Sequence, residues 1–202
     1  MTRQNHSGRN LCTDATSVFH RLLAETGYPA SLEEVASTLD VPPSTMMSVF
    51  RDGAHLMEVA VESALLRLHD RCIRAMAVID GADPIAQLEA LADAYIGWAI
   101  DHPGVFLAFH SPALGALREN DCLTRFERSV TVLMQRLLVR AKKGGLLAGE
   151  DNAEVLAELI RAFICGALHK VMLERLPQGK PDPEDLAEMR ANLRLLLQRL
   201  VG

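Results

Sequence analysis

The sequence predicts an all-α protein of about nine helices, and three observations support this prediction. Apolar residues make up 49% of the 202 residues, so there is ample material for a buried core. Helix formers dominate the composition, whereas the β-branched and aromatic runs typical of strands are scarce. Between turn signals, apolar residues recur at the three- and four-residue spacing of an amphipathic helix.

Turn signals and helix caps give each expected helix its bounds. The expected ranges are about 11–27, 31–39, 44–50, 52–79, 84–102, 105–110, 121–143, 152–176 and 183–201. Ser31 and Glu34 have the spacing of a capping box, which predicts where the second helix begins. Pro42 and Pro43 interrupt the pattern before the third helix, and Asp52 is a suitable N-cap for the long fourth one.

Later helices are bounded by similar signals. Asp83-Pro84 opens the fifth helix, and His102-Pro103-Gly104 closes it. Gly144-Gly145 ends the helix at 121–143, whose last turn carries Lys142 and Lys143, where the helix dipole favours cations.

Composition and charge also exclude several classes of protein. The four cysteines are far apart and form no CxxC pair, so neither a zinc site nor a redox motif is indicated, and we expect no bound metal or cofactor. The polar start of the chain does not resemble a secretory signal, and no apolar stretch reaches the length of a membrane span. We therefore expect a soluble, cytoplasmic protein with no membrane partner. The net charge of −5 suits solubility but not phosphate binding.

The helices at 31–39 and 44–50 form the outline of a helix-turn-helix. They are short, joined by a turn of about four residues, and preceded by a stabilising helix. The small residue Ala36 suits the crossing point of the two helices, while Val41 and Met46 would fill the corner between them. The sequence thus predicts a helix-turn-helix DNA-binding domain over residues 1–56 and a helical domain for ligand binding and dimerisation over residues 57–202.

Residue order within 31–56 is similar to that of the DNA-binding unit of the tetracycline-repressor (TetR) family. The matching residues are Ser31, Val35, Ala36, Val41, Thr45, Met46, Phe50 and Leu56. Three later segments resemble parts of the second domain in one subgroup of that family. They are residues 95–103, with His102-Pro103 at their end, residues 143–146 and residues 162–173. The resemblance implies a homodimeric transcriptional regulator, most simply a repressor, whose two helix-turn-helix units bind a double-stranded DNA operator.

Three positions depart from the family pattern, and all three bear on DNA. The turn glycine is replaced by Asp40, the aromatic residue of the third helix by Met47, and the lysine that opens the fourth helix by Gly53. Four cations and six anions give residues 1–56 a net charge of −2, whereas a DNA-binding domain usually has a basic face. A second hypothesis is therefore open: a TetR-shaped protein that binds a ligand or partner and has lost operator binding.

If DNA is bound, short hydroxyl side chains and one cation are the expected contacts. These residues are Ser31, Ser44, Thr45, Ser48 and Arg51. Arg51 is the only cation between residues 27 and 56, so it should supply much of the local attraction to phosphate.

Aromatic and histidine side chains in the second domain predict a pocket for a small, largely apolar effector. The candidate lining residues are Trp98, Phe106, Phe109, His110, Phe126 and His169. The alternative interpretation is that these residues are core aromatics and hydrogen-bonded histidines. We do not expect an enzyme, because the chain has no Gly-x-Ser-x-Gly elbow and no glycine-rich phosphate loop.

The last two expected helices carry apolar stripes that suit a dimer interface. Helix 183–201 has a stripe that includes Leu193 and Leu197, and helix 152–176 places the small residues Ala162 and Gly166 where another helix could approach closely. Packing within one chain would explain the same stripes. Taken with the family resemblance, they predict a four-helix bundle between two copies of the chain.

Overall fold

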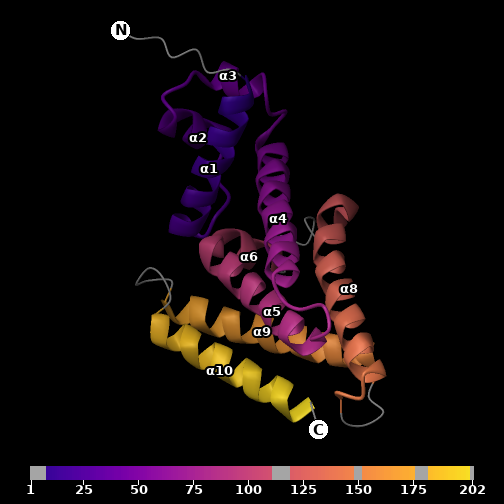
Figure 1. Cartoon of the computed structure of the whole chain (residues 1–202). Coiled ribbons are helices and arrows are strands. Elements are labelled where there is room, and N and C mark those ends of the chain that lie inside the picture. Colours follow the sequence, from indigo (N-terminus) through magenta and orange to yellow (C-terminus); the bar gives the residue numbers. More distant parts are fainter. Residues whose placement is uncertain (1–7, 111–118, 148–151, 176–181, 201–202) are drawn as a thin grey trace. The chain divides into compact units, whose positions relative to one another are not determined.

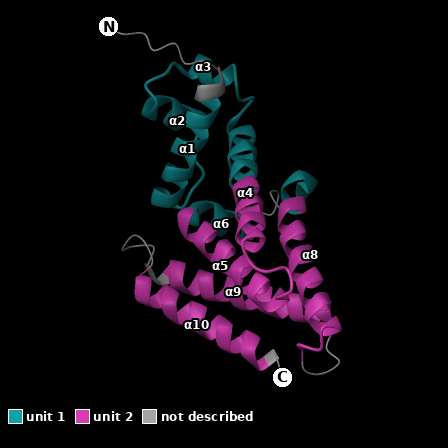
Figure 2. Cartoon of the chain, viewed as in Figure 1, with its two compact units in different colours: residues 1–65, 102–124 teal, residues 66–101, 125–202 magenta. Residues whose placement is uncertain are grey.

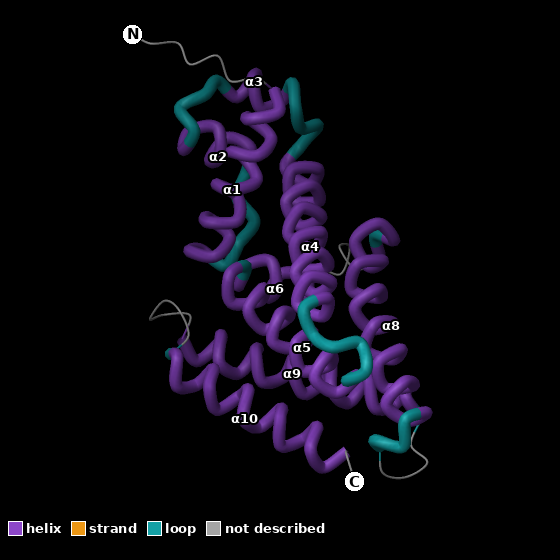
Figure 3. The backbone as a smooth tube through the Cα atoms, viewed as in Figure 1, coloured by secondary structure: helices purple, strands orange, loops and turns teal. Residues whose placement is uncertain are grey.

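A computed structural model describes residues 8–110, 119–147, 152–175 and 182–200 of the chain (Figure 1). These residues form helices joined by turns and loops, with no strand among them (Figure 3). The helices are α1 (Gly8–Thr26), α2 (Leu32–Thr38), α3 (Pro43–Met47), α4 (Gly53–Ala77), α5 (Pro84–Asp101), α6 (Pro103–His110), α8 (Asp121–Lys143), α9 (Ala153–Arg175) and α10 (Pro183–Leu200). The all-α prediction is confirmed.

Most helix bounds agree with the sequence because the expected caps form. The backbone N–H of His55 donates to the Asp52 carboxylate at 2.8 Å, so Asp52 caps α4. At the end of α8, Gly145 has a φ of +69° and the Leu146 N–H donates to the Ala141 carbonyl at 2.9 Å, which is a Schellman closure. Residues 176 and 201, the expected ends of the last two helices, lie outside the described part of the chain.

The third helix is shorter than expected. It covers Pro43–Met47 rather than 44–50, although the Phe50 N–H still donates to the Met46 carbonyl at 2.8 Å. The Ser48 hydroxyl donates to the Thr45 carbonyl at 2.7 Å, which gives that carbonyl a side-chain partner where the regular helix ends.

The chain forms two compact units, coloured separately in Figure 2. Unit 1 comprises residues 1–65 and 102–124, and unit 2 comprises residues 66–101 and 125–202. Helices α4 and α8 are thus shared between them. The predicted boundary after residue 56 separates two functions, whereas the two units are defined by compactness alone. The functional boundary therefore stays a prediction.

Unit 1 holds all of α1, α2, α3 and α6, together with the first half of α4 and the first residues of α8. Its core is made by apolar side chains that are almost completely buried, among them Phe19, Leu23, Met46, Phe50 and Leu56. Helix α1 packs against α2 and α6. The His20 ring nitrogen Nε2 lies 2.9 Å from the Ala60 carbonyl oxygen, which ties α1 to α4.

Unit 2 is built around α5, which packs against α9 and α10. Its buried side chains include Trp98 of α5 and Ile160 of α9. Leu193 and Leu197 of α10 are 3% and 2% exposed, so they belong to the core of a single chain. No helix among the described residues is long and apolar enough to cross a membrane.

Candidate functional site

Helix α2 begins with the capping box that the sequence predicts. The Ser31 backbone N–H donates to the Glu34 carboxylate at 2.7 Å, and the Glu34 N–H donates to the Ser31 hydroxyl oxygen at 3.2 Å. The bond from the Ser31 backbone, and after it the interaction of the carboxylate with the Ser31 side chain, lowers the pKa of Glu34. The Ser31 side chain therefore has a structural role in unit 1, whether or not it also contacts DNA.

The turn between α2 and α3 is closed by Asp40, the residue that replaces the family's glycine. Asp40 has a φ of +54°, in the left-handed region. The Val41 N–H donates to the Ala36 carbonyl at 3.0 Å and the Asp40 N–H to the Ser37 carbonyl at 3.2 Å, which together form a Schellman motif. Asp40 thus gives the turn the geometry that glycine would give, at the cost of one negative charge.

Helix α3 and the residues after it present a mostly polar surface, here called the α3 surface. It consists of the exposed residues Ser44, Met47, Ser48 and Arg51 and the half-buried Thr45. Met46 of α3 and Ala36 of α2 are almost completely buried. The structure therefore places four of the five predicted DNA contacts on one short segment, with Ser31 at the start of α2.

Met47 is the member of the α3 surface that the sequence did not indicate as a contact. Its side chain is 66% exposed although it is large and apolar. Its place next to the predicted residues was a usable signal, because it stands where the family has an aromatic residue.

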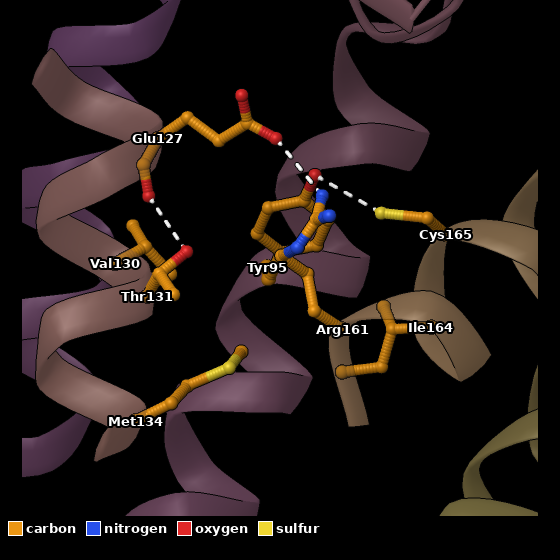
Figure 4. Close-up of a pocket in the computed structure, with 8 residues that line it drawn as sticks. All are labelled: Tyr95, Glu127, Val130, Thr131, Met134, Arg161, Ile164 and Cys165. Carbon is orange, nitrogen blue, oxygen red and sulfur yellow. Dashed lines mark hydrogen bonds and ion pairs between the residues drawn. The ribbon is translucent and has the colours of Figure 1, made fainter. Parts of the chain in front are cut away.

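A second candidate site is a small cavity in unit 2. It is lined from α5, α8 and α9 by Tyr95, Glu127, Val130, Thr131, Met134, Arg161, Ile164 and Cys165 (Figure 4). Its volume is about 10 Å³, the room of about one water molecule. In Figure 4 the Glu127 carboxylate, the Tyr95 hydroxyl and the Cys165 sulfur lie toward one end of this site, and Met134 and Ile164 lie toward the other.

The polar end of the cavity is an ion-pair network. The Arg161 guanidinium donates to the Glu127 carboxylate at 3.2 Å and to both oxygens of Glu158 at 2.6 and 2.9 Å. The bonds to Glu158 raise the pKa of Arg161, and the same contact lowers the pKa of Glu158. Arg161 is therefore a fixed cation that half-buried Glu127 helps to orient.

Tyr95 is the buried polar group of the cavity. Its hydroxyl oxygen lies 3.8 Å from the Cys165 sulfur, and burial, together with Cys165 and Glu127, raises the Tyr95 pKa well above its ordinary value. Tyr95 thus stays a neutral phenol at physiological pH. A hydroxyl, a thiol, a carboxylate and a guanidinium at one end of an apolar wall suit the recognition of a small ligand that has one polar end.

None of the six predicted effector-binding residues lines this cavity, but three lie beside residues that do. The Trp98 ring centroid is 5.9 Å from that of Tyr95, a His169 ring nitrogen is 2.8 Å from the Cys165 carbonyl oxygen, and Phe126 precedes Glu127. The other three, Phe106, Phe109 and His110, belong to unit 1. Phe106 and Phe109 are buried there, and a His110 ring nitrogen lies 2.8 Å from the Phe106 carbonyl oxygen.

Glu127 and Arg161 were not predicted as site residues, because charged side chains are usually found on solvated faces of a helix. A signal was available. On α8, Glu127 lies at helical spacing from Val130, Thr131 and Met134. On α9, Arg161 lies at helical spacing from Ile164 and Cys165. Two charges of opposite sign therefore interrupt two stripes of residues that otherwise face the core.

In the described residues, no group of three potential metal ligands lies close enough together to hold an ion.

The architecture is shared with several solved structures. A structure of a protein with unknown function from Rhodococcus sp. RHA1 has a TM-score of 0.76 at 21% identity and covers 100% of both chains. A putative transcriptional regulator from Saccharomonospora viridis, solved in complex with choline, has a TM-score of 0.74 at 17% identity over 98% of each chain. A TetR-family regulator from Agrobacterium tumefaciens has a TM-score of 0.73 at 19% identity, covering 97% of this chain and 100% of that one.

These likenesses show the fold, and the family of the chain is shown by its sequence. The family model described as "Tetracyclin repressor-like, C-terminal domain" matches residues 88–192, more than half of the chain. The chain therefore belongs to the TetR family. Among curated proteins, no sequence matches it significantly.

Proposed function

We propose that this protein is a homodimeric transcriptional repressor that binds operator DNA and responds to a small effector. The observation that carries the proposal is the α3 surface, in a chain of the TetR family. Three hydroxyl groups and one guanidinium follow a turn and a buried helix corner, which is the arrangement that presents side chains to the major groove. The family generally acts by binding rather than catalysis, and we propose no enzymatic activity.

Electrostatic attraction to phosphate should contribute little to the affinity for DNA. Arg51 is the only cation near the α3 surface in sequence, so few counterions would be released, and the salt dependence of affinity should be shallow. Thr45 and Ser48 carry short hydroxyls suited to base edges, whereas Arg51 suits phosphate.

The test measures binding of the purified protein to DNA from upstream of its own gene and to unrelated DNA, over a range of salt concentrations. Arg51→Ala should weaken binding to both DNAs alike, and Thr45→Ala should change the preference between them. Arg74→Ala, which removes an exposed cation of unit 2, is the matched control and should change neither. A parent protein that binds no DNA at low salt would instead favour the second hypothesis, a TetR-shaped protein that has lost operator binding.

Dimerisation through α9 and α10 is supported by an exposed apolar stripe on α9. Val155, Leu159 and Leu173 are exposed although they are large and apolar, and the exposed small residues Ala162 and Gly166 lie between them. No heavy atom lies within 4 Å of a Cβ built on Gly166, so a second helix has room to approach there. Leu195 adds an exposed apolar side chain on α10.

For the effector, we propose the cavity at Tyr95, Glu127, Arg161 and Cys165, with Trp98, Phe126 and His169 next to it. The choline complex of the Saccharomonospora regulator supports small-molecule binding by this fold. Thermal shifts with choline, octanoate and decanol would compare a cation, an anion and a neutral alcohol. Tyr95→Phe should reduce the shift of whichever compound binds, and Thr26→Val in unit 1 is the control. If no compound in a broader panel of small molecules stabilises the protein, effector sensing is not supported.

A further inference from the structure

Met47 is a large, exposed apolar side chain on the α3 surface, whose other members carry hydroxyl groups or a guanidinium. Met47 lies three residues after Ser44 on α3, and the exposed residues Ser48 and Arg51 follow it after the helix ends. Its neighbour Met46 is completely buried, whereas Met47 itself is 66% exposed. The segment thus directs one methionine into the core and the other outward, among the hydroxyl groups.

The chemistry of Met47 limits what it could contact on DNA. A thioether side chain has no hydrogen-bond donor and no charge, so it gains nothing from phosphate and cannot read a polar base edge as hydroxyl or amide groups do. In the major groove of B-DNA, the apolar group presented by a base is the C5 methyl of thymine. Burial of the Met47 side chain against DNA is therefore favourable mainly where it meets the methyl group of a thymine.

The charge of the N-terminal segment increases the weight of such a contact. Residues 1–56 have a net charge of −2, with Arg51 as the only cation after residue 27. When phosphate neutralisation contributes little, contacts with base edges have to supply a larger share of the affinity. Ser44 and Ser48 can supply polar contacts, and Met47 supplies the apolar one, with three rotatable bonds that let it follow the groove surface.

We infer that Met47 is a specificity-determining residue that contacts the C5 methyl group of one thymine in each half-site of the operator. The inference rests on the proposed function, because it requires that the α3 surface enters the major groove. It adds a testable property of the operator, namely that one thymine per half-site is recognised by its methyl group.

The test begins with sites selected by the full-length protein from a random duplex library. Each thymine of the selected site is then replaced by deoxyuridine, which lacks the methyl group but keeps the base pair. At one position per half-site, we expect affinity to fall about fourfold, equivalent to about 0.8 kcal/mol for one buried methyl group. Deoxycytidine should be a poor substitute there, and 5-methyl-deoxycytidine should recover part of the loss.

Protein variants then assign the effect to Met47. Met47→Ala should bring the ratio of thymine to deoxyuridine affinity close to one, while Met47→Leu, still apolar, should keep it. Tyr28→Ala is the matched control, because Tyr28 is also an exposed apolar residue of unit 1 but lies outside α3, and it should leave the ratio unchanged.

The outcomes separate the inference from the proposed function. If selected sites bind tightly but no thymine can be distinguished from deoxyuridine, or if Met47→Ala keeps the full ratio, the contact with thymine is wrong and DNA binding stands. If the selection yields no preferred sequence at low salt, the proposed function and the inference both fail.

Discussion

Gly104 of α6 lies directly against the backbone of Leu23 in α1. A Cβ atom built on Gly104 would lie 2.9 Å from the Leu23 carbonyl carbon and 2.8 Å from the Ala24 amide nitrogen. Real Cβ contacts are not this short, so the two helices approach each other closely only because residue 104 has no side chain. This contact belongs to the packing of α1 on α6 inside unit 1.

Gly104→Ala should destabilise the protein by about 1–3 kcal/mol, because the added methyl group meets backbone atoms that cannot move independently. Gly97→Ala is the informative comparison, because a Cβ there meets only the end of the Arg71 side chain. That side chain can swing away, with the loss of an exposed ion pair to Asp101 that contributes about 0–1 kcal/mol. Urea unfolding of both variants measures the difference, and equal losses would contradict this account of Gly104.

Leu159→Glu should give a folded monomer. Leu159 is 57% exposed in the single chain, so the substitution removes apolar area from the proposed α9 interface without creating a cavity. Leu193→Glu and Leu197→Glu should instead unfold unit 2, because both leucines are buried in its core. Light scattering gives the oligomeric state and circular dichroism the folding. A monomeric parent protein would exclude the homodimer.

Cys72 should make the protein less stable at high pH. Burial raises the pKa of this thiol to about 12, against 9.0 for an exposed one. Between these values the unfolded chain loses the thiol proton and the folded chain retains it, so stability falls as pH rises, by roughly 1.4 kcal/mol per pH unit at most. Urea melts of the parent and of Cys72→Ala from pH 8.5 to 10.5 should diverge, with the steeper decline in the parent. Parallel curves would show that Cys72 contributes nothing.

Asp40→Asn should strengthen DNA binding without loss of stability. Asparagine tolerates the left-handed φ of +54° and removes one negative charge beside the α3 surface. The gain should be largest at low salt, where exposed charges interact over longer distances. Asp40→Ala removes the same charge but should cost about 1 kcal/mol, because alanine is strained at this φ. If Asn and Ala variants gain no affinity at low salt, the Asp40 charge is not close to the DNA.

Local signals were sufficient to predict the helices, whereas the cavity depends on how helices are rotated against one another. The Asp52 cap, the Ser31–Glu34 capping box and the Gly144-Gly145 turn act within a few residues and could be recognised in the sequence. The bond between Arg161 and Glu127 joins residues 34 positions apart on two helices. Each residue taken alone resembles a surface charge, so only the rotation of α8 and α9 shows that both line a cavity.

The stripe on the last helix shows the same limit. Leu193 and Leu197 were correctly assigned to an apolar face of 183–201, but periodicity gives no information about the partner of a face. In the structure that face packs within unit 2, where Arg190 of the same helix also donates to Asp93 of α5 at 3.1 Å. The exposed face of α9, with Leu159, is a separate surface.

The small size of the cavity has a thermodynamic consequence for any effector that binds there. At about 10 Å³ the described conformation admits a water molecule but no organic compound, so binding must draw on a more open conformation. The apparent dissociation constant then equals the intrinsic one divided by the fraction of molecules already open. If an effector binds there, its apparent affinity depends partly on how well Met134 and Ile164 pack in its absence, and a looser wall would lower the concentration required without any new contact.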